Sequence, residues 1–186
     1  NWMFLDFSAR NAGECRFPRL QDVIYQKEFD QRTGLSTLIL GRKDFSCDWV
    51  WDMEINDTLI AGKKYDAHLS AWQDGDRNSY FSIYETITLL DEVTANEFSE
   101  ITEDYPTING SKSPITITDP NASNSYIDCV VFDKFTVCRV TLGYKKIVSE
   151  FKLTFVDLSK QQIKELIDSV VASNSKRIHE YEAGLQ

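Results

Sequence analysis

The sequence predicts an α+β protein dominated by β-structure, in which an antiparallel sheet carries an amphipathic C-terminal helix on one face. Several segments alternate apolar and polar residues, which is the period of a strand with one buried face. Short polar runs separate these segments, as in hairpins and meanders. Near the C-terminus, apolar residues recur at three- and four-residue steps, the period of a helix. The pattern leaves open whether the strands form one layer or fold into two.

Length and composition favour a single domain over residues 1–186. The chain has 186 residues, of which 42% are hydrophobic, and domains usually contain about 100–150 residues. This is enough apolar surface for one packed core. No apolar run approaches the roughly 20 residues that a membrane-spanning helix needs, so we expect no membrane span.

Most strands are expected before residue 91. Residues 19–29 and 35–41 flank the turn sequence DQRTG and predict a hairpin with Gly34 in a left-handed conformation. Residues 48–55 alternate strictly, and residues 63–73 and 79–90 alternate on either side of DGDRN. One face of the segment 48–55 carries Trp49, Trp51, Met53 and Ile55. We interpret this face as core; the alternative is an exposed aromatic surface for sugar rings.

The period changes after residue 90. Thr94 and Glu97 have the spacing of a capping box, which predicts a short acidic helix within residues 91–105, ended by Pro106. Residues 106–125 are rich in Ser, Thr, Asn, Pro and Gly and are expected to form a long loop, with ITIT as its one short strand. Residues 145–155 again alternate as a strand. A second capping box, Ser159 with Gln162, then starts a helix expected over about 160–173 and fraying towards Tyr181.

The cysteine spacing predicts a disulfide across a hairpin. In CVVFDKFTVC, two β-prone runs flank the dipeptide Asp133–Lys134. If this dipeptide is the hairpin loop, Cys129 faces Cys138 in a non-hydrogen-bonded pair, whose Cα atoms approach to about 4.5 Å. A disulfide can span that distance. Asp-Lys is not a favoured loop sequence, so two buried free thiols are the alternative interpretation.

The other two cysteines then pair by elimination. Cys15 and Cys47 would form a second disulfide, and none of the four cysteines lies in the C-x-x-C pattern of a zinc ribbon or a redox motif. Two disulfides predict an oxidising compartment, so we expect a secreted protein that is extracellular or periplasmic.

The charge of the chain restricts its partners. The 29 acidic and 20 basic side chains give a net charge of −9. Such a field repels a phosphate backbone unless basic residues gather on one face, and no such cluster is visible. Nucleic acids and anionic membranes are therefore excluded as expected partners. A cationic protein or peptide fits the field better.

No residue pattern assigns a catalytic, cofactor or metal site. Asp74, Asp76, Asn78 and Glu85 have the spacing of a calcium loop. An EF-hand needs flanking helices and a glycine at its sixth position, but here both flanks alternate as strands and Ser79 takes that position. We interpret the segment as a polar hairpin loop; without Glu85, the remaining ligands would hold at most a weakly bound cation.

The two histidines also lack a local catalytic signature. His68 falls on the polar face of a predicted strand, and His179 lies near the end of the last helix. The glycine loops of nucleotide-binding proteins are missing from the sequence. These observations favour a protein that is not an enzyme.

The leading hypothesis is an exported, non-enzymatic binding domain with a protein or peptide partner, in an inhibitor or immunity-type role. The first alternative is a carbohydrate-binding module with weak calcium assistance, based on the Asp74 loop and the tryptophan strand. The second is a hydrolase that uses Asp or Glu, which would need an open cleft holding a carboxylate with a raised pKa.

Overall fold

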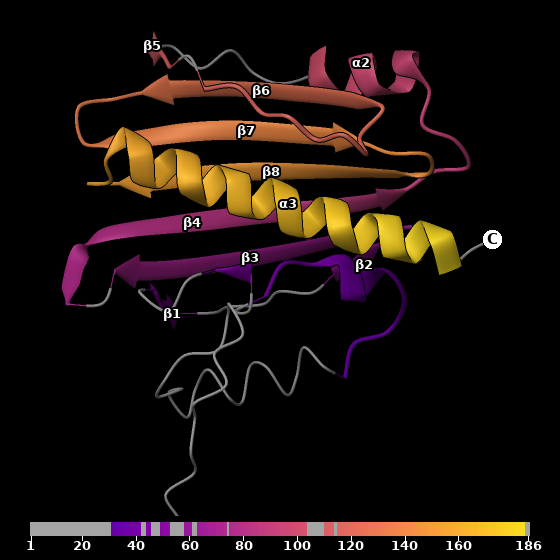
Figure 1. The fold of residues 1–186 in the computed structure, drawn as a ribbon, viewed down its shortest axis with the longest axis horizontal. Coiled ribbons are helices and arrows are strands. Elements are labelled where there is room, and N and C mark those ends of the chain that lie inside the picture. Colours follow the sequence, from indigo (N-terminus) through magenta and orange to yellow (C-terminus); the bar gives the residue numbers. More distant parts are fainter. Residues whose placement is uncertain are drawn as a thin grey trace, which may run out of the picture.

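A computed structural model describes residues 31–41, 44–45, 49–52, 58–60, 63–73, 75–103, 110–113 and 115–184. The elements in chain order are η1 (Gly34–Leu38), β1 (Trp49–Asp52), β2 (Thr58–Ile60), β3 (Lys64–Gln73), β4 (Asp76–Leu89), α2 (Ala95–Glu103), β5 (Ser111–Lys112), β6 (Asn124–Val131), β7 (Phe135–Gly143), β8 (Ile147–Val156) and α3 (Lys160–Gly184). Figure 1 shows α3 lying across one face of the sheet. The predicted α+β fold dominated by β-structure is therefore confirmed.

The described strands form one antiparallel sheet. Its order is β1-β3-β4-β8-β7-β6-β5, and β2 also pairs with β3. The hairpins β3–β4, β6–β7 and the β7–β8 meander join neighbours in sequence, as the alternating pattern predicts. The pairing of β4 with β8 instead joins two distant parts of the chain. This long-range pairing places the two halves of the molecule in one sheet (Figure 1).

The two faces of the sheet differ in what covers them. On β4, the side chains that lie under α3 and η1 are all buried: Ser79, Phe81, Ile83, Glu85 and Ile87. The neighbours that point the other way, Tyr80 and Tyr84, are exposed. We call the first side the covered face and the second the open face. The alternation of β4 alone therefore separates core from surface.

The helix α3 is longer than the sequence predicts. Its start is confirmed, because the Ser159 and Gln162 side chains each accept a hydrogen bond from the other residue's backbone N–H. Its buried stripe continues past Val171 through Asn174, Ser175 and Ile178. The prediction ended too early because two of these positions are polar. Both side chains are buried through hydrogen bonds, Asn174 with Ser149 of the sheet and Ser175 with Asp119 of the loop 117–121, which no apolar periodicity reveals.

The helix α2 covers one end of the open face. Its predicted capping box is confirmed: Glu97 accepts from the Thr94 N–H at 3.0 Å, and Thr94 Oγ1 accepts from the Glu97 N–H at 3.2 Å. Phe98 packs over Gly143, where an added Cβ would lie 2.8 Å from the Phe98 ring. Glycine at position 143 therefore allows α2 to approach the sheet closely.

One predicted strand is wrong. Residues 35–41 were expected to alternate as a strand, but Gly34–Leu38 forms a 3-10 helix. Gly34 itself has φ +62°, the predicted left-handed conformation. The apolar residues Leu35 and Leu38 are three apart, so one turn of a 3-10 helix places both on the buried side. Residues 19–29, the other half of the predicted hairpin, lie outside the described part of the chain.

Two further predictions concern loops and membrane spans. Within the predicted loop 106–125, the structure places the short strand β5 and begins β6 at Asn124, whereas residues 115–118, read as ITIT, form no strand. The remaining described residues of this stretch are irregular. None of the helices in the described ranges has the length and apolarity to cross a membrane.

Candidate functional site

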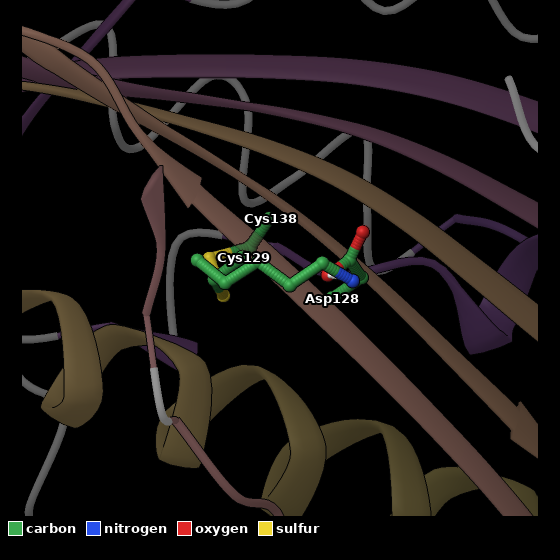
Figure 2. The surroundings of a disulfide bond; sticks show 4 residues. Asp128, Cys129 and Cys138 are labelled. Atoms are coloured by element: carbon green, nitrogen blue, oxygen red, sulfur yellow. Dashed lines mark ion pairs between the residues drawn. A yellow bond between two sulfur atoms is a disulfide. The ribbon is translucent and has the colours of Figure 1, made fainter. Parts of the chain in front are cut away.

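The predicted disulfide between Cys129 and Cys138 is confirmed. The two residues face each other in the β6–β7 register and are joined, with 4.1 Å between their Cα atoms. The Phe132 N–H donates to the Phe135 carbonyl at 2.8 Å, which closes the Asp133–Lys134 loop as expected. Figure 2 shows the disulfide beside Asp128. Under the chain-entropy account, a loop of this length stabilises the fold by about 3 kcal/mol.

The second predicted disulfide stays a prediction. Cys15 and Cys47 both lie outside the described residues.

Near the confirmed bridge, Lys112 Nζ lies 3.2 Å from Asp128 Oδ1, an ion pair that connects the short edge strand β5 to β6. The Cys129–Cys138 hairpin is a structural element, and both of its sulfur atoms are used in the bond.

The residues of the calcium-like loop are separated along β4. Asp76 Oδ1 accepts from the Asn78 N–H at 3.0 Å, and Asp76 Oδ2 accepts from the Ser79 hydroxyl at 2.8 Å. These hydrogen bonds lower the pKa of Asp76, so its carboxylate acts as a turn cap. Glu85 lies further along β4 on the covered face. Among the described residues, no cluster of three His, Cys, Asp or Glu side chains has the geometry to hold a metal ion; Asp74 lies outside this set.

The two histidines lie apart from each other. His68 is on the open face, where its ring stacks on Tyr84 with 4.0 Å between the ring centroids. Its Nε2 has no hydrogen-bond partner in the described part of the structure. His179 is exposed on α3 and lines a groove with Ser175 and Asp119. There, the Ser175 hydroxyl donates to Asp119 at 2.8 Å, which is not the serine–histidine contact of a nucleophilic triad.

This groove, of about 560 Å³, lies between residues 117–121 and α3. Asp119 accepts hydrogen bonds from the Tyr144 hydroxyl at 2.7 Å and from Ser175. Asn174 donates to the Tyr144 oxygen at 3.0 Å and accepts from Ser149 at 3.1 Å. Burial and the neighbouring Asp119 raise the pKa of Tyr144, so the phenol stays neutral. The network anchors the loop to the sheet and the helix, and it occupies the polar atoms of Asp119 with internal partners.

Glu85 is a carboxylate in the core, which we did not predict from the sequence. Its side chain is 1% exposed. Burial raises the pKa of Glu85 to about 8. The Leu40 N–H and the Arg177 charge act in the opposite direction, but their effect is smaller. The signal was present in the sequence, because Glu85 falls on the same alternating face as Phe81, Ile83 and Ile87. A side chain this deeply buried cannot contact a substrate, so Glu85 does not provide the open cleft that the hydrolase alternative needs.

The open face carries an aromatic surface. Three large hydrophobic side chains of the described residues are exposed: Tyr80 (41%), Tyr84 (54%) and Phe135 (40%). The register brings Tyr80 and Phe135 to either side of Val156, and Tyr84 lies four residues along β4 on the same side. All three therefore point away from α3, and we call them the aromatic patch.

Trp72 and Arg77 lie beside this patch. The Arg77 guanidinium lies 5.8 Å from the Trp72 ring centroid. These two side chains and Tyr80 line an open hollow of about 400 Å³, with Ser70 and Ala71. Among the tryptophan side chains that the structure describes, the one that contributes to this surface is Trp72 on β3. Trp49, which the sequence assigned to the core, is indeed buried against Phe81; the side chain of Trp51 lies outside the description.

Charged residues border the aromatic patch at the loop end of the sheet. Three aspartates there are exposed: Asp76, Asp133 and Asp157. Arg77, which is held over Trp72, and Lys134 lie among them. Further along the same face, Lys152 lies opposite Tyr84, and Arg139 lies opposite Lys152. The border of the patch therefore carries both acidic and basic side chains, and the acidic excess belongs to the chain as a whole, whose net charge is −9.

Comparisons with known proteins identify no relative. No protein-family model matches the chain, and neither curated proteins nor solved structures give a significant match.

Proposed function

We propose that this protein is a non-enzymatic binding domain whose open face engages a cationic protein or peptide. One observation carries the proposal: the exposed large hydrophobic residues among the described ones, Tyr80, Tyr84 and Phe135, all lie on the face that α3 leaves uncovered. Exposed apolar clusters with a polar border are typical of protein interaction sites, and tyrosine is enriched in them.

The charge of the molecule supports a cationic partner. The net charge is −9, and three exposed aspartates, Asp76, Asp133 and Asp157, lie at the loop end of the aromatic patch, whose border carries both signs of charge. Such a field accelerates association with a partner of opposite charge and disfavours acidic competitors. An inhibitor or immunity-type role toward a secreted cationic protein is the narrower form of the proposal.

An oxidising location is part of the proposal. The Cys129–Cys138 disulfide is of a kind that persists in extracellular or periplasmic proteins and is rare in the cytosol. The partner would therefore be met outside the reducing compartment.

Selection of displayed peptides tests the proposed surface. Random peptides on phage are selected on the wild-type protein, and the affinity of each enriched peptide is measured by interferometry. We expect peptides rich in Lys and Arg that bind a Tyr80→Ala/Tyr84→Ala/Phe135→Ala variant about tenfold or more weakly, because interface aromatics supply much of the binding energy. A Lys164→Ala/Glu165→Ala variant, changed on the exposed side of α3, should bind as the wild type does.

Two results would contradict the proposal. One is the enrichment of neutral or acidic peptides. The other is unchanged affinity for the triple variant, provided that its urea midpoint shows that it is folded. All three replaced side chains are exposed, so the triple variant should keep its fold.

A carbohydrate ligand is the second candidate, favoured by the hollow between Trp72, Arg77 and Tyr80. Aromatic rings and a guanidinium on an open surface can hold a sugar ring by stacking and hydrogen bonds. Calorimetry with a glycan panel, in millimolar calcium and again in chelator, tests it. Saturable binding that Trp72→Ala abolishes would support a carbohydrate site. Because Asp76 already uses both oxygens within its turn, we expect calcium to change neither the heat of binding nor the melting temperature.

A further inference from the structure

Glu85 connects the segment Gly34–Gly41 to the sheet. Its Oε2 accepts a hydrogen bond from the Leu40 N–H at 2.8 Å. Its Oε1 is buried and has no hydrogen-bond partner among the described residues. A buried oxygen without a partner is costly, and it is far more costly when the group carries a charge. The protonation state of Glu85 therefore affects how firmly the segment is held.

The charged groups near Glu85 offset only part of the cost of burying its charge. From α3, Arg177 uses one nitrogen for the Ile39 carbonyl at 2.7 Å and another for the Asp44 carboxylate. Asp44 opposes ionisation of Glu85, whereas Arg177 and Arg32 favour it. The neighbours opposite Glu85 on β3 and β8 are Ala67 and Phe151, which carry no charge. Burial is the dominant influence, and it favours the neutral acid.

Charged residues of the described part of the chain attach the segment at two further points. The Gly41 N–H donates to Asp44 Oδ2 at 2.6 Å, and Arg177 binds both Asp44 and the Ile39 carbonyl. Leu38, Ile39 and Leu40 bury their side chains in the main core. These apolar contacts keep the segment docked in most molecules, so a change at Glu85 would appear as a change in how often the segment opens.

We propose that Glu85 is a proton-dependent latch, which holds the segment Gly34–Gly41 on the sheet when its carboxyl group is protonated and loosens it when the proton is lost. The latch acts through the cost of burying a charged carboxylate, which exceeds the gain from the stronger hydrogen bond that this carboxylate would accept from Leu40. The strands and α3 keep their packing in both states.

The direction of the pH dependence follows from linkage. The pKa of Glu85 is raised from the ordinary value of 4.5 to about 8 in the docked state. In the proposed open state water reaches the carboxyl group and its pKa returns to the ordinary value, so the docked state binds more protons than the open state between these values. Opening therefore becomes about tenfold more frequent with each pH unit in this window. Below pH 4.5 both states are protonated, and above about pH 8 both are ionised, so opening no longer changes with pH at either end.

Hydrogen–deuterium exchange of peptides spanning residues 34–41, from pH 5 to pH 9 and corrected for the intrinsic exchange rate, tests the latch. In the wild type we expect protection to fall about tenfold per pH unit and to level off near pH 8. In Glu85→Gln, which keeps an acceptor for Leu40 but does not titrate, protection should be independent of pH. Glu165→Gln, an exposed position on α3, should behave as the wild type does.

A pH-independent wild-type profile, or an equal fall in Glu85→Gln, would overturn the latch. Should Glu85→Gln not fold, carbon-13 NMR of the glutamate carboxyl groups in the wild type decides the matter. One carboxyl group titrating near pH 8 supports the latch, and titration of every glutamate below pH 6 contradicts it.

Discussion

Replacing Arg177 by methionine is expected to lower the free energy of unfolding by about 3 to 5 kcal/mol, the range for breaking a buried ion pair. The Arg177 and Asp44 side chains are only 18% and 8% exposed, with 2.5 Å between Nη2 and Oδ2. Methionine retains the aliphatic stem but leaves the Asp44 charge and the Ile39 carbonyl without this donor. Urea unfolding followed by circular dichroism measures the loss.

A second ion pair with the same distance between its charged atoms but greater exposure serves as the control for burial. The pair Lys164–Asp168 also has 2.5 Å between its charged atoms, but its side chains are 53% and 51% exposed. Lys164→Met should change stability by less than about 1 kcal/mol, because solvent screens an exposed pair. Adding Asp44→Asn to Arg177→Met should recover part of the loss, since it removes the unpaired charge. An Arg177→Met loss no larger than that of Lys164→Met would refute the burial argument.

Substitutions at two neighbouring residues of β4, Phe81 and Tyr80, are expected to have different effects: the first should lower stability and the second should lower binding affinity. Phe81→Ala should cost about 3 to 5 kcal/mol, because Phe81 is fully buried and packs against Phe45 and Trp49 with ring centroids 5.4 and 4.7 Å away. Tyr80→Ala, one residue earlier on the open face, should change the urea midpoint little. Unfolding curves of the two variants check the difference.

In binding measurements the order should be reversed, with Tyr80→Ala affected more than Phe81→Ala. Selected peptides are expected to lose affinity for Tyr80→Ala. For Phe81→Ala, affinity measured well below its unfolding midpoint should stay near the wild-type value, because Phe81 lies on the covered face. A large loss of stability in Tyr80→Ala would mean that the aromatic patch is part of the core and not a binding surface.

Local patterns predicted much of the fold because their causes are local. The hairpin register that places Cys129 opposite Cys138 follows from a two-residue loop and the period of a strand. Both capping boxes depend on residues three positions apart, and both form. The covered face of β4 could likewise be assigned from alternation, as could the place of Glu85 on it.

Other features depend on contacts between distant segments. The 3-10 helix Gly34–Leu38 replaces a predicted strand where its apolar residues join the core beneath α3. The helix continues through Asn174 because Ser149 and Tyr144, from the sheet side, hydrogen-bond its side chain. The aromatic patch also depends on contacts between distant segments, because Tyr80 on β4 and Phe135 on β7 become neighbours only when both strands pair with β8.

Composition and short-range patterns were enough to predict the main antiparallel strands, the two helix starts, the Cys129–Cys138 pairing and the acidic charge, because each depends on composition or on residues within one turn or hairpin. The assembled structure was needed to show that β4 pairs with β8, that one sheet face stays open with its tyrosines exposed, and that Glu85 is enclosed beside Leu40. Burial and long-range pairing are properties of the whole core, because segments far apart in the chain compete there for the same apolar surface.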